Sequence, residues 1–113
     1  MVKLNYIPER GDIILINFNP QKGKEQAGYR PAFIVSPLAY NKMASLALMC
    51  PITSAIKGLS FEVILTDEMQ TKGVILVDHL KSLDWKARRV KFVEKAPMSV
   101  VNEVLAKLET LVS

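Results

Sequence analysis

The sequence predicts a mainly β domain closed by one C-terminal helix. Apolar runs of strand length recur from Ile13 to Glu94, separated by the glycine, proline and asparagine residues that favour turns. After Pro97 the apolar residues recur at three- and four-residue steps, the period of a helix. A chain of 113 residues supports one core, so we expect a single domain over residues 1–113. Short strands followed by one helix indicate a strongly bent antiparallel sheet or a small barrel.

The first expected strand is the run Ile13–Phe18, which is too short for a helix and rich in β-branched residues. The second ends at Pro37, and residues 38–42 after it are expected to form one short helical turn. In the last strand charged residues alternate with apolar ones, so one of its faces should meet solvent. The expected strands span residues 13–18, 31–36, 46–52, 61–65, 73–78 and 89–94.

The C-terminal helix is expected to be amphipathic. Pro97 suits its first turn, where the missing N–H would have had no partner. The apolar face of the helix is formed by Val101, Val104, Leu105, Leu108, Leu111 and Val112.

Composition and charge restrict the function classes. Half of the residues are hydrophobic and 23% are charged, which is typical of a folded domain rather than a disordered chain. We expect no signal peptide and no membrane span, because the apolar runs are only strand-sized, and hence a cytoplasmic protein. The net charge of +4 favours an anionic partner. The single cysteine, Cys50, is expected in a buried strand and not at a catalytic site.

The segment Gly23–Pro31 is the strongest site candidate from the residues alone. It is polar, punctuated by glycine and long for a connection in so small a domain. It carries a carboxylate, Glu25, and a guanidinium, Arg30, directly before an apolar strand. A polar loop presented by a rigid strand is a common way to build a functional site.

Several short motifs occur in order along the whole chain: Gly11-Asp12, Phe18-Asn19-Pro20, Gly23-x-Glu25-Gln26-x-Gly28-x-Arg30-Pro31, Ser36-Pro37, Pro51-Ile52-Thr53 and Asp78-x-x-Lys81. Together they resemble the motifs of the MazF/PemK family of toxin endoribonucleases, and the MazF branch more than the PemK branch. The resemblance implies a small SH3-like barrel of the MazF/CcdB type with a C-terminal helix, acting as a homodimer. It also implies cleavage of single-stranded RNA through the substrate's 2′-OH, without a metal or other cofactor. The expected products carry a 2′,3′-cyclic phosphate and a 5′-OH, and the expected inhibitor is an acidic, MazE-like antitoxin.

The same resemblance assigns the catalytic candidates. Arg30 matches the family's catalytic arginine, and its charged planar fork suits a phosphorane transition state. Thr53 matches the active-site threonine and would orient a phosphate oxygen or the nucleophile. Glu25 would serve as base or would orient Arg30, and the sequence does not separate these roles. The proton donor stays open as well, because arginine is a poor acid.

Further residues are candidates for RNA contacts. Lysines can follow the RNA backbone and aromatic rings can stack on bases. Tyr29 and Trp85 are additional possible stacking surfaces, although core packing is the plainer interpretation of Trp85. The expected RNA-binding residues are Phe18, Lys57, His79 and Lys81.

His79 and Asp78 leave the mechanism partly open. Histidine exchanges protons readily near neutral pH, so His79 is a candidate base, but a lone histidine after an apolar strand more often has a structural or RNA-contacting role. Relatives commonly have glutamine at this place. Asp78 matches an aspartate that acts as base in PemK-type enzymes, but the arginine and histidine of that mechanism are replaced here by Leu76 and Lys24.

Two other functions stay open at this point. One is a CcdB-like toxin that binds DNA gyrase and cuts nothing, since fold alone does not determine function. The other is a basic RNA-binding module without catalysis.

Overall fold

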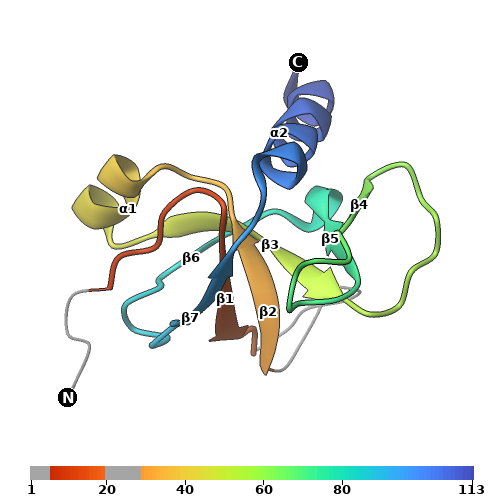
Figure 1. Ribbon diagram of the computed structural model, residues 1–113. Helices are drawn as coiled ribbons and strands as arrows, with labels where there is room; N and C mark the ends of the chain where they lie inside the picture. Colours follow the sequence, from red (N-terminus) through yellow and green to blue (C-terminus); the bar gives the residue numbers. More distant parts are fainter. Residues whose placement is uncertain (1–5, 20–28) are drawn as a thin grey trace.

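A strongly bent antiparallel sheet is the centre of the molecule (Figure 1). In this computed structural model the described residues are 6–19 and 29–113. The elements in chain order are β1 (Asp12–Asn17), β2 (Tyr29–Ile34), α1 (Leu38–Ala44), β3 (Ala47–Thr53), β4 (Glu62–Ile64), β5 (Val74–Leu76), the 3₁₀ turn η1 (Val77–His79), β6 (Lys81–Leu83), β7 (Lys91–Lys95) and α2 (Met98–Val112).

The strand order of the seven-stranded sheet is β4-β5-β3-β2-β1-β7, and β6 pairs with β3 beside β5. Within the described part of the chain, β4 and β7 are the two ends of this order and do not pair. The fold class predicted from the sequence, mainly β with a C-terminal helix, is therefore confirmed, but the sheet is open and not a closed barrel.

Each face of the sheet buries its own apolar cluster, because successive strand residues point to opposite faces. On one face Ile13, Phe33 and Cys50 pack under Val100 and Val104 of α2. On the other face Ile14, Ile34, Met49 and Trp85 pack together, and we call this group the second cluster; its remaining buried members are Ile16, Phe18, Ala32 and Ala47. The burial predicted for Cys50 is confirmed, since its side chain is fully buried in β3.

The second cluster is fixed by a buried polar residue, Asn41 of α1. Its amide nitrogen donates to the carbonyl oxygens of Pro8 (2.8 Å) and Ser36 (3.0 Å). Its own backbone oxygen accepts a hydrogen bond from the indole N–H of Trp85 (3.0 Å). Trp85 is 8% exposed, so it belongs to the core, as its plainer interpretation predicted, and offers little surface to a ligand.

The start of β1 is fixed by a second buried polar residue, Asp12, which is 1% exposed. Its carboxylate accepts hydrogen bonds from the Tyr6 hydroxyl (2.7 Å), the Glu9 N–H (3.0 Å) and the Lys95 ammonium (2.8 Å). The hydrogen bond to Asp12 raises the pKa of Lys95 most strongly, and a second one from the same ammonium to Glu9 Oε1 (3.2 Å) raises it further. The Gly11-Asp12 motif therefore has a structural role in this chain.

No helix in residues 6–19 or 29–113 is long and apolar enough to cross a membrane.

Candidate nucleic-acid interface

Arg30 and Thr53 are brought together by the pairing of β2 with β3. The observed pairs are Ala32 with Pro51, Phe33 with Cys50 and Ile34 with Met49. Arg30 lies two residues before Ala32, and Thr53, the last residue of β3, lies two residues after Pro51, so both stand at the same end of the two strands. Because side chains alternate along a strand, both residues lie on the face that carries Ala32 and Pro51. They therefore lie at the open end of the second cluster, 23 positions apart in the sequence.

The close contact between Thr53 and the start of β5 depends on a glycine. Gly73 has a φ of +116°, and a Cβ at this position would lie 2.1 Å from the Thr53 carbonyl oxygen. Val74, the next residue, pairs with Thr53. Only glycine lets the two backbones approach this closely, so Gly73 fixes the position of Thr53.

Asp78 and His79 are pushed out of the sheet by a change of register along β3. Thr53 pairs with Val74 and Ile52 with Ile75, a register that would bring Met49 opposite Asp78. Met49 pairs instead with Lys81, so the three residues of η1 are extruded between β5 and β6. The sequence predicted one strand over residues 73–78 and did not predict β6.

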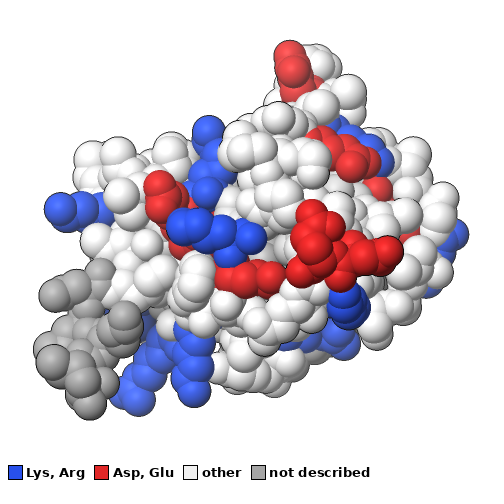
Figure 2. Space-filling view, in the orientation of Figure 1, with Lys and Arg blue, Asp and Glu red and all other residues white. Residues whose placement is uncertain are grey.

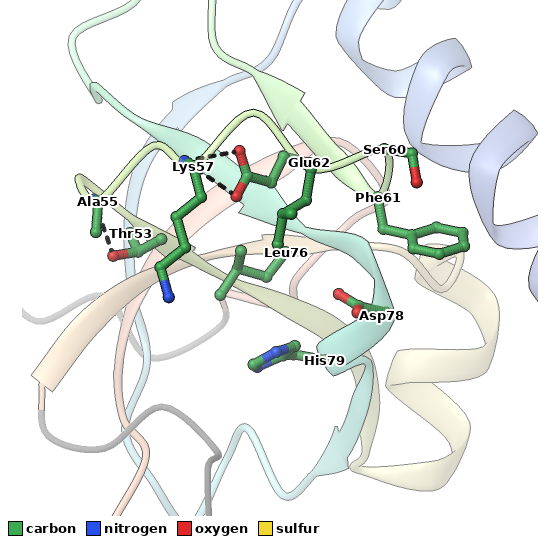
Figure 3. A pocket seen from close by; sticks show the side chains of 10 residues that line it. Thr53, Ala55, Lys57, Ser60, Phe61, Glu62, Leu76, Asp78 and His79 are labelled. Atoms are coloured by element: carbon green, nitrogen blue, oxygen red, sulfur yellow. Dashed lines mark hydrogen bonds between the residues drawn. The ribbon is translucent and has the colours of Figure 1, made fainter.

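A cavity of about 440 Å³ lies between this turn and the loop that follows β3 (Figure 3). Its lining residues are Thr53, Ala55, Lys57, Leu59, Ser60, Phe61, Glu62, Leu76, Asp78 and His79. The lining therefore combines polar and apolar side chains, which suits a base with its sugar and phosphate. His79 Nδ1 is buried and has no hydrogen-bond partner among the described residues.

The loop that carries Lys57 is held by side-chain oxygens at both of its ends. The Thr53 hydroxyl accepts a hydrogen bond from the Ala55 N–H (3.2 Å). At the other end the buried carboxylate of Glu62 accepts from the backbone N–H groups of Lys57 (3.2 Å) and Gly58 (3.0 Å). Glu62 was not predicted as a site residue. It belongs to a strand with alternating polar and apolar residues, and this pattern does not predict that Glu62 is buried.

The other predicted RNA contacts differ in their exposure. Lys81 shares the face of Met49, roughly 13 Å along β3 from Thr53 at the usual rise per residue. Tyr29 is 56% exposed beside Arg30. Phe18 is only 3% exposed and packs in the second cluster, so the prediction that it binds RNA is not supported. Glu25 lies outside the described residues.

One basic side chain near the site has a structural task. The Arg88 guanidinium donates to the carbonyl oxygens of Asn17 (2.6 Å) and Asn19 (3.0 Å) and so holds the end of β1. Figure 2 shows lysine and arginine side chains gathered at the lower left of this view, while acidic side chains gather near its centre and right. Charge is therefore unevenly distributed on this face.

Among the described residues no group of three or more histidine, cysteine, aspartate or glutamate side chains is arranged to hold a metal ion. The Cys50 thiol also lies apart from the cavity lining. Burial, with a smaller contribution from the charge of Asp78, raises its pKa to about 12.

Comparison with known proteins identifies the family. Residues 9–112 match the family described as the PemK-like, MazF-like toxin of type II toxin-antitoxin systems. The chain belongs to this PemK/MazF family. It is 46% identical over 83 residues to the endoribonuclease toxin MazF of Escherichia coli K12, covering 74% of each protein. It is 38% identical over 109 residues to the Escherichia coli endoribonuclease PemK, covering 93% of this chain and 82% of that protein.

Solved PemK/MazF structures agree with the fold. MazF from Deinococcus radiodurans superposes with a TM-score of 0.91 at 46% identity, covering 95% of this chain and 97% of that one. A MazE-MazF structure from the same organism matches with a TM-score of 0.85 at 40% identity, covering 96% and 98%. The matching curated relatives are named endoribonucleases, so the CcdB-like alternative is not favoured.

Proposed function

We propose that this chain is the toxin of a type II toxin-antitoxin system, an endoribonuclease that cuts single-stranded RNA in the cytoplasm at short sequences and so inhibits translation and growth. The observation that carries the proposal is the pairing of β2 with β3, which leaves Arg30 and Thr53 at the same end of the two strands, on one face of the sheet. Thr53 also lines a cavity that combines polar and apolar side chains. Membership of the PemK/MazF family supports the same activity.

The proposed reaction is an internal transesterification. The 2′-oxygen attacks the adjacent phosphorus and loses its proton, the O2′–P bond forms, and the bond from phosphorus to the 5′-oxygen breaks. The leaving 5′-oxygen takes up a proton, which gives a 2′,3′-cyclic phosphate and a 5′-OH. No metal takes part in the proposal. Arg30 stabilises the charge that develops on the phosphorane oxygens, and Thr53 orients a phosphate oxygen or the nucleophile.

The proton transfers are assigned less fully. Glu25 is proposed to accept the proton of the 2′-OH or to orient Arg30. The place of His79 in the cavity wall supports a contact with RNA. Lys57 and Lys81 are proposed to bind phosphates, and the exposed ring of Tyr29 to stack on a base.

Two partners follow from the family. The Deinococcus radiodurans relative has been solved together with MazE. We propose that this chain forms a homodimer and that an acidic, MazE-like antitoxin inhibits it by occupying the RNA-binding surface near Arg30. Protection of RNA by such a peptide is the expected result, and binding that leaves cleavage undiminished would contradict it.

The test of the activity uses a long mixed-sequence RNA in EDTA. We expect cleavage at a limited set of sites with cyclic phosphate ends, and a loss of rate of roughly a hundredfold or more in Arg30→Ala, as for removal of one preorganised charge donor. Arg30→Lys should recover only part of the rate, because an ammonium lacks the planar fork. Lys42→Ala, which removes one positive charge from the exposed surface of α1, is the matched control.

The alternatives give different results in the same preparation. Inhibition of DNA gyrase in a supercoiling assay, with RNA left whole, would establish the CcdB-like function instead. RNA that is bound and recovered whole, with binding that weakens in salt, would establish a binding module without catalysis. Cleavage that is unchanged in Arg30→Ala would refute the proposed role of that residue.

A further inference from the structure

Glu62 is a buried carboxylate beside the cavity with no role in the proposed chemistry. It is 6% exposed, at the first position of β4. A buried charge needs partners, and here they are the backbone N–H groups of Lys57 and Gly58. The carboxylate therefore binds main chain and leaves the Lys57 ammonium unused.

The Lys57 side chain takes the opposite direction. Figure 3 shows its ammonium end directed away from the Glu62 carboxylate, toward the side of the cavity where Thr53 and His79 lie. Among the described carboxylates none forms an ion pair with Lys57. A lysine whose backbone is fixed while its ammonium stays available is well arranged to bind a phosphate.

The loop that Glu62 holds is closed by further hydrogen bonds. The Glu62 N–H donates to the Leu59 carbonyl oxygen (3.1 Å), and Gly58 has a φ of +75°, a backbone conformation that favours glycine. The strand behind the loop is supported by α2, because the Lys107 ammonium donates to the Glu62 carbonyl oxygen (2.9 Å). Glu62 thus connects the loop to β4 and, through Lys107, to α2.

We infer that Glu62 is a positioning residue for RNA binding: its carboxylate fixes the backbone at Lys57 and Gly58 so that the Lys57 ammonium faces the cavity. The inference rests on the proposed endoribonuclease function and deepens it. Glu62 acts only through Lys57 and does not touch the RNA. Its effect therefore belongs to substrate binding, measured by KM, and not to the chemical step, measured by kcat.

The test begins with Glu62→Gln, which keeps the shape of the side chain but replaces one acceptor oxygen by an N–H donor. We expect KM for a short RNA substrate to rise roughly five- to tenfold, the effect of one phosphate contact, with kcat within about twofold of the unchanged protein. The slope of RNA affinity against salt should fall by about 0.7, the value for one phosphate on a single strand. Glu68→Gln, the same change at an exposed position, should alter none of these quantities.

A double substitution separates positioning from a general loss of stability. Lys57→Met should raise KM by a similar factor, and Glu62→Gln added to Lys57→Met should raise it no further. If the two substitutions together raise KM by the product of their single effects, the inference is overturned. A fall in kcat at unchanged KM would overturn it as well. If Glu62→Gln does not fold, Gly58→Ala disturbs the same loop, because alanine is strained at a φ of +75°, and should give the same change in KM.

The outcomes distinguish this inference from the proposed function. If the unchanged protein cuts no RNA, the proposed function fails. If it cuts RNA and Glu62→Gln behaves like Glu68→Gln, only the role of Glu62 fails.

Discussion

At the scale of single residues, the sequence shows which chemical groups are available for the site. It does not show which of them lie next to one another. Arg30 and Thr53 were expected in the site from their motifs, and their proximity follows only from the register of β2 with β3. Glu62 could not be predicted because an alternating strand does not say which of its polar residues is buried with partners. Phe18 packs in the second cluster, and the sequence could not place it because an aromatic residue at a strand end suits a core as well as a binding surface.

The hydroxyl of Thr53 is expected to matter more than its shape. Thr53→Val keeps the β-branched form and removes the oxygen, so we expect the cleavage rate to fall roughly tenfold or more through lost orientation. The loop after β3 should loosen slightly, because Ala55 N–H loses its acceptor. Rates from single-turnover cleavage with excess protein check this prediction. Thr53→Ser keeps the oxygen and should recover most of the rate; equal rates for the two variants would contradict an orienting role.

Cys50 is expected to be chemically inert in the folded protein. Burial raises its pKa to about 12, while an unfolded chain would ionise near the ordinary value of 9.0. Since the thiolate is the reactive form, iodoacetamide at pH 8 should leave the native protein unlabelled and label it after unfolding in urea. Mass spectrometry of the two samples checks this. Rapid labelling of the native protein would show that β3 opens far more readily than its burial suggests.

At the scale of elements, the extruded turn η1 is the feature that creates the cavity wall. The run Gly73–Asp78 reads as one strand because all its residues except the last are apolar or small. The structure interrupts it because β3 pairs with β5 and β6 in registers that differ by three residues. β6 was not predicted because a strand of three residues, Lys81–Leu83, has too little pattern to detect. The boundaries of the other strands were predicted within about two residues.

The turn between β4 and β5 depends on a carboxylate of β7. Glu94 accepts hydrogen bonds from the Gln70 N–H (3.0 Å) and from the Thr71 N–H and hydroxyl (2.6 Å each). Partial burial opposes its ionisation, but the hydrogen bonds from Thr71 and Gln70 outweigh this and lower its pKa. The ionised form is therefore the one that the fold favours.

Acid should consequently destabilise the protein through this residue. A carboxylate with a lowered pKa contributes stability that is fully present above its unfolded value of 4.5 and is lost as pH falls through the folded value. We expect the free energy of unfolding to fall less steeply below pH 4.5 in Glu94→Gln than in the unchanged protein. Urea unfolding at a series of pH values checks this. Parallel curves for the two proteins would show that Glu94 is not linked to folding.

At the scale of the whole molecule, the two apolar clusters on opposite faces of one sheet explain why the fold class was predictable. Their residues come from alternating positions of β1, β2 and β3, and this alternation is what the sequence displays. α2 covers one cluster and is readable from its own period. The open order of the strands could not be predicted, because local sequence patterns do not show which distant strands pair with one another.

The anchoring of β1 by Arg88 has a consequence for the segment 20–28, whatever its conformation. Arg88 holds the carbonyl oxygens of Asn17 and Asn19, and Asn17 pairs with Tyr29, so both ends of this segment are tethered to the core. Lengthening this segment should change the free energy of folding little, because even a doubling of a loop's length adds only about 0.6 kcal/mol to the entropic cost of closing it. The effective concentration of Glu25 near Arg30 would nevertheless fall as the tether lengthens.

Stability and catalysis should therefore separate when about four glycine and serine residues are inserted after Lys22. We expect a melting temperature close to that of the unchanged protein and a cleavage rate that is lower by roughly fivefold or more, if Glu25 serves the reaction. The same insertion in Glu25→Gln should change the rate little, and an unaltered rate in the first variant would mean that Glu25 is only a solvated charge. If the expected result is found, the length of this segment would set the cleavage rate independently of the free energy of unfolding.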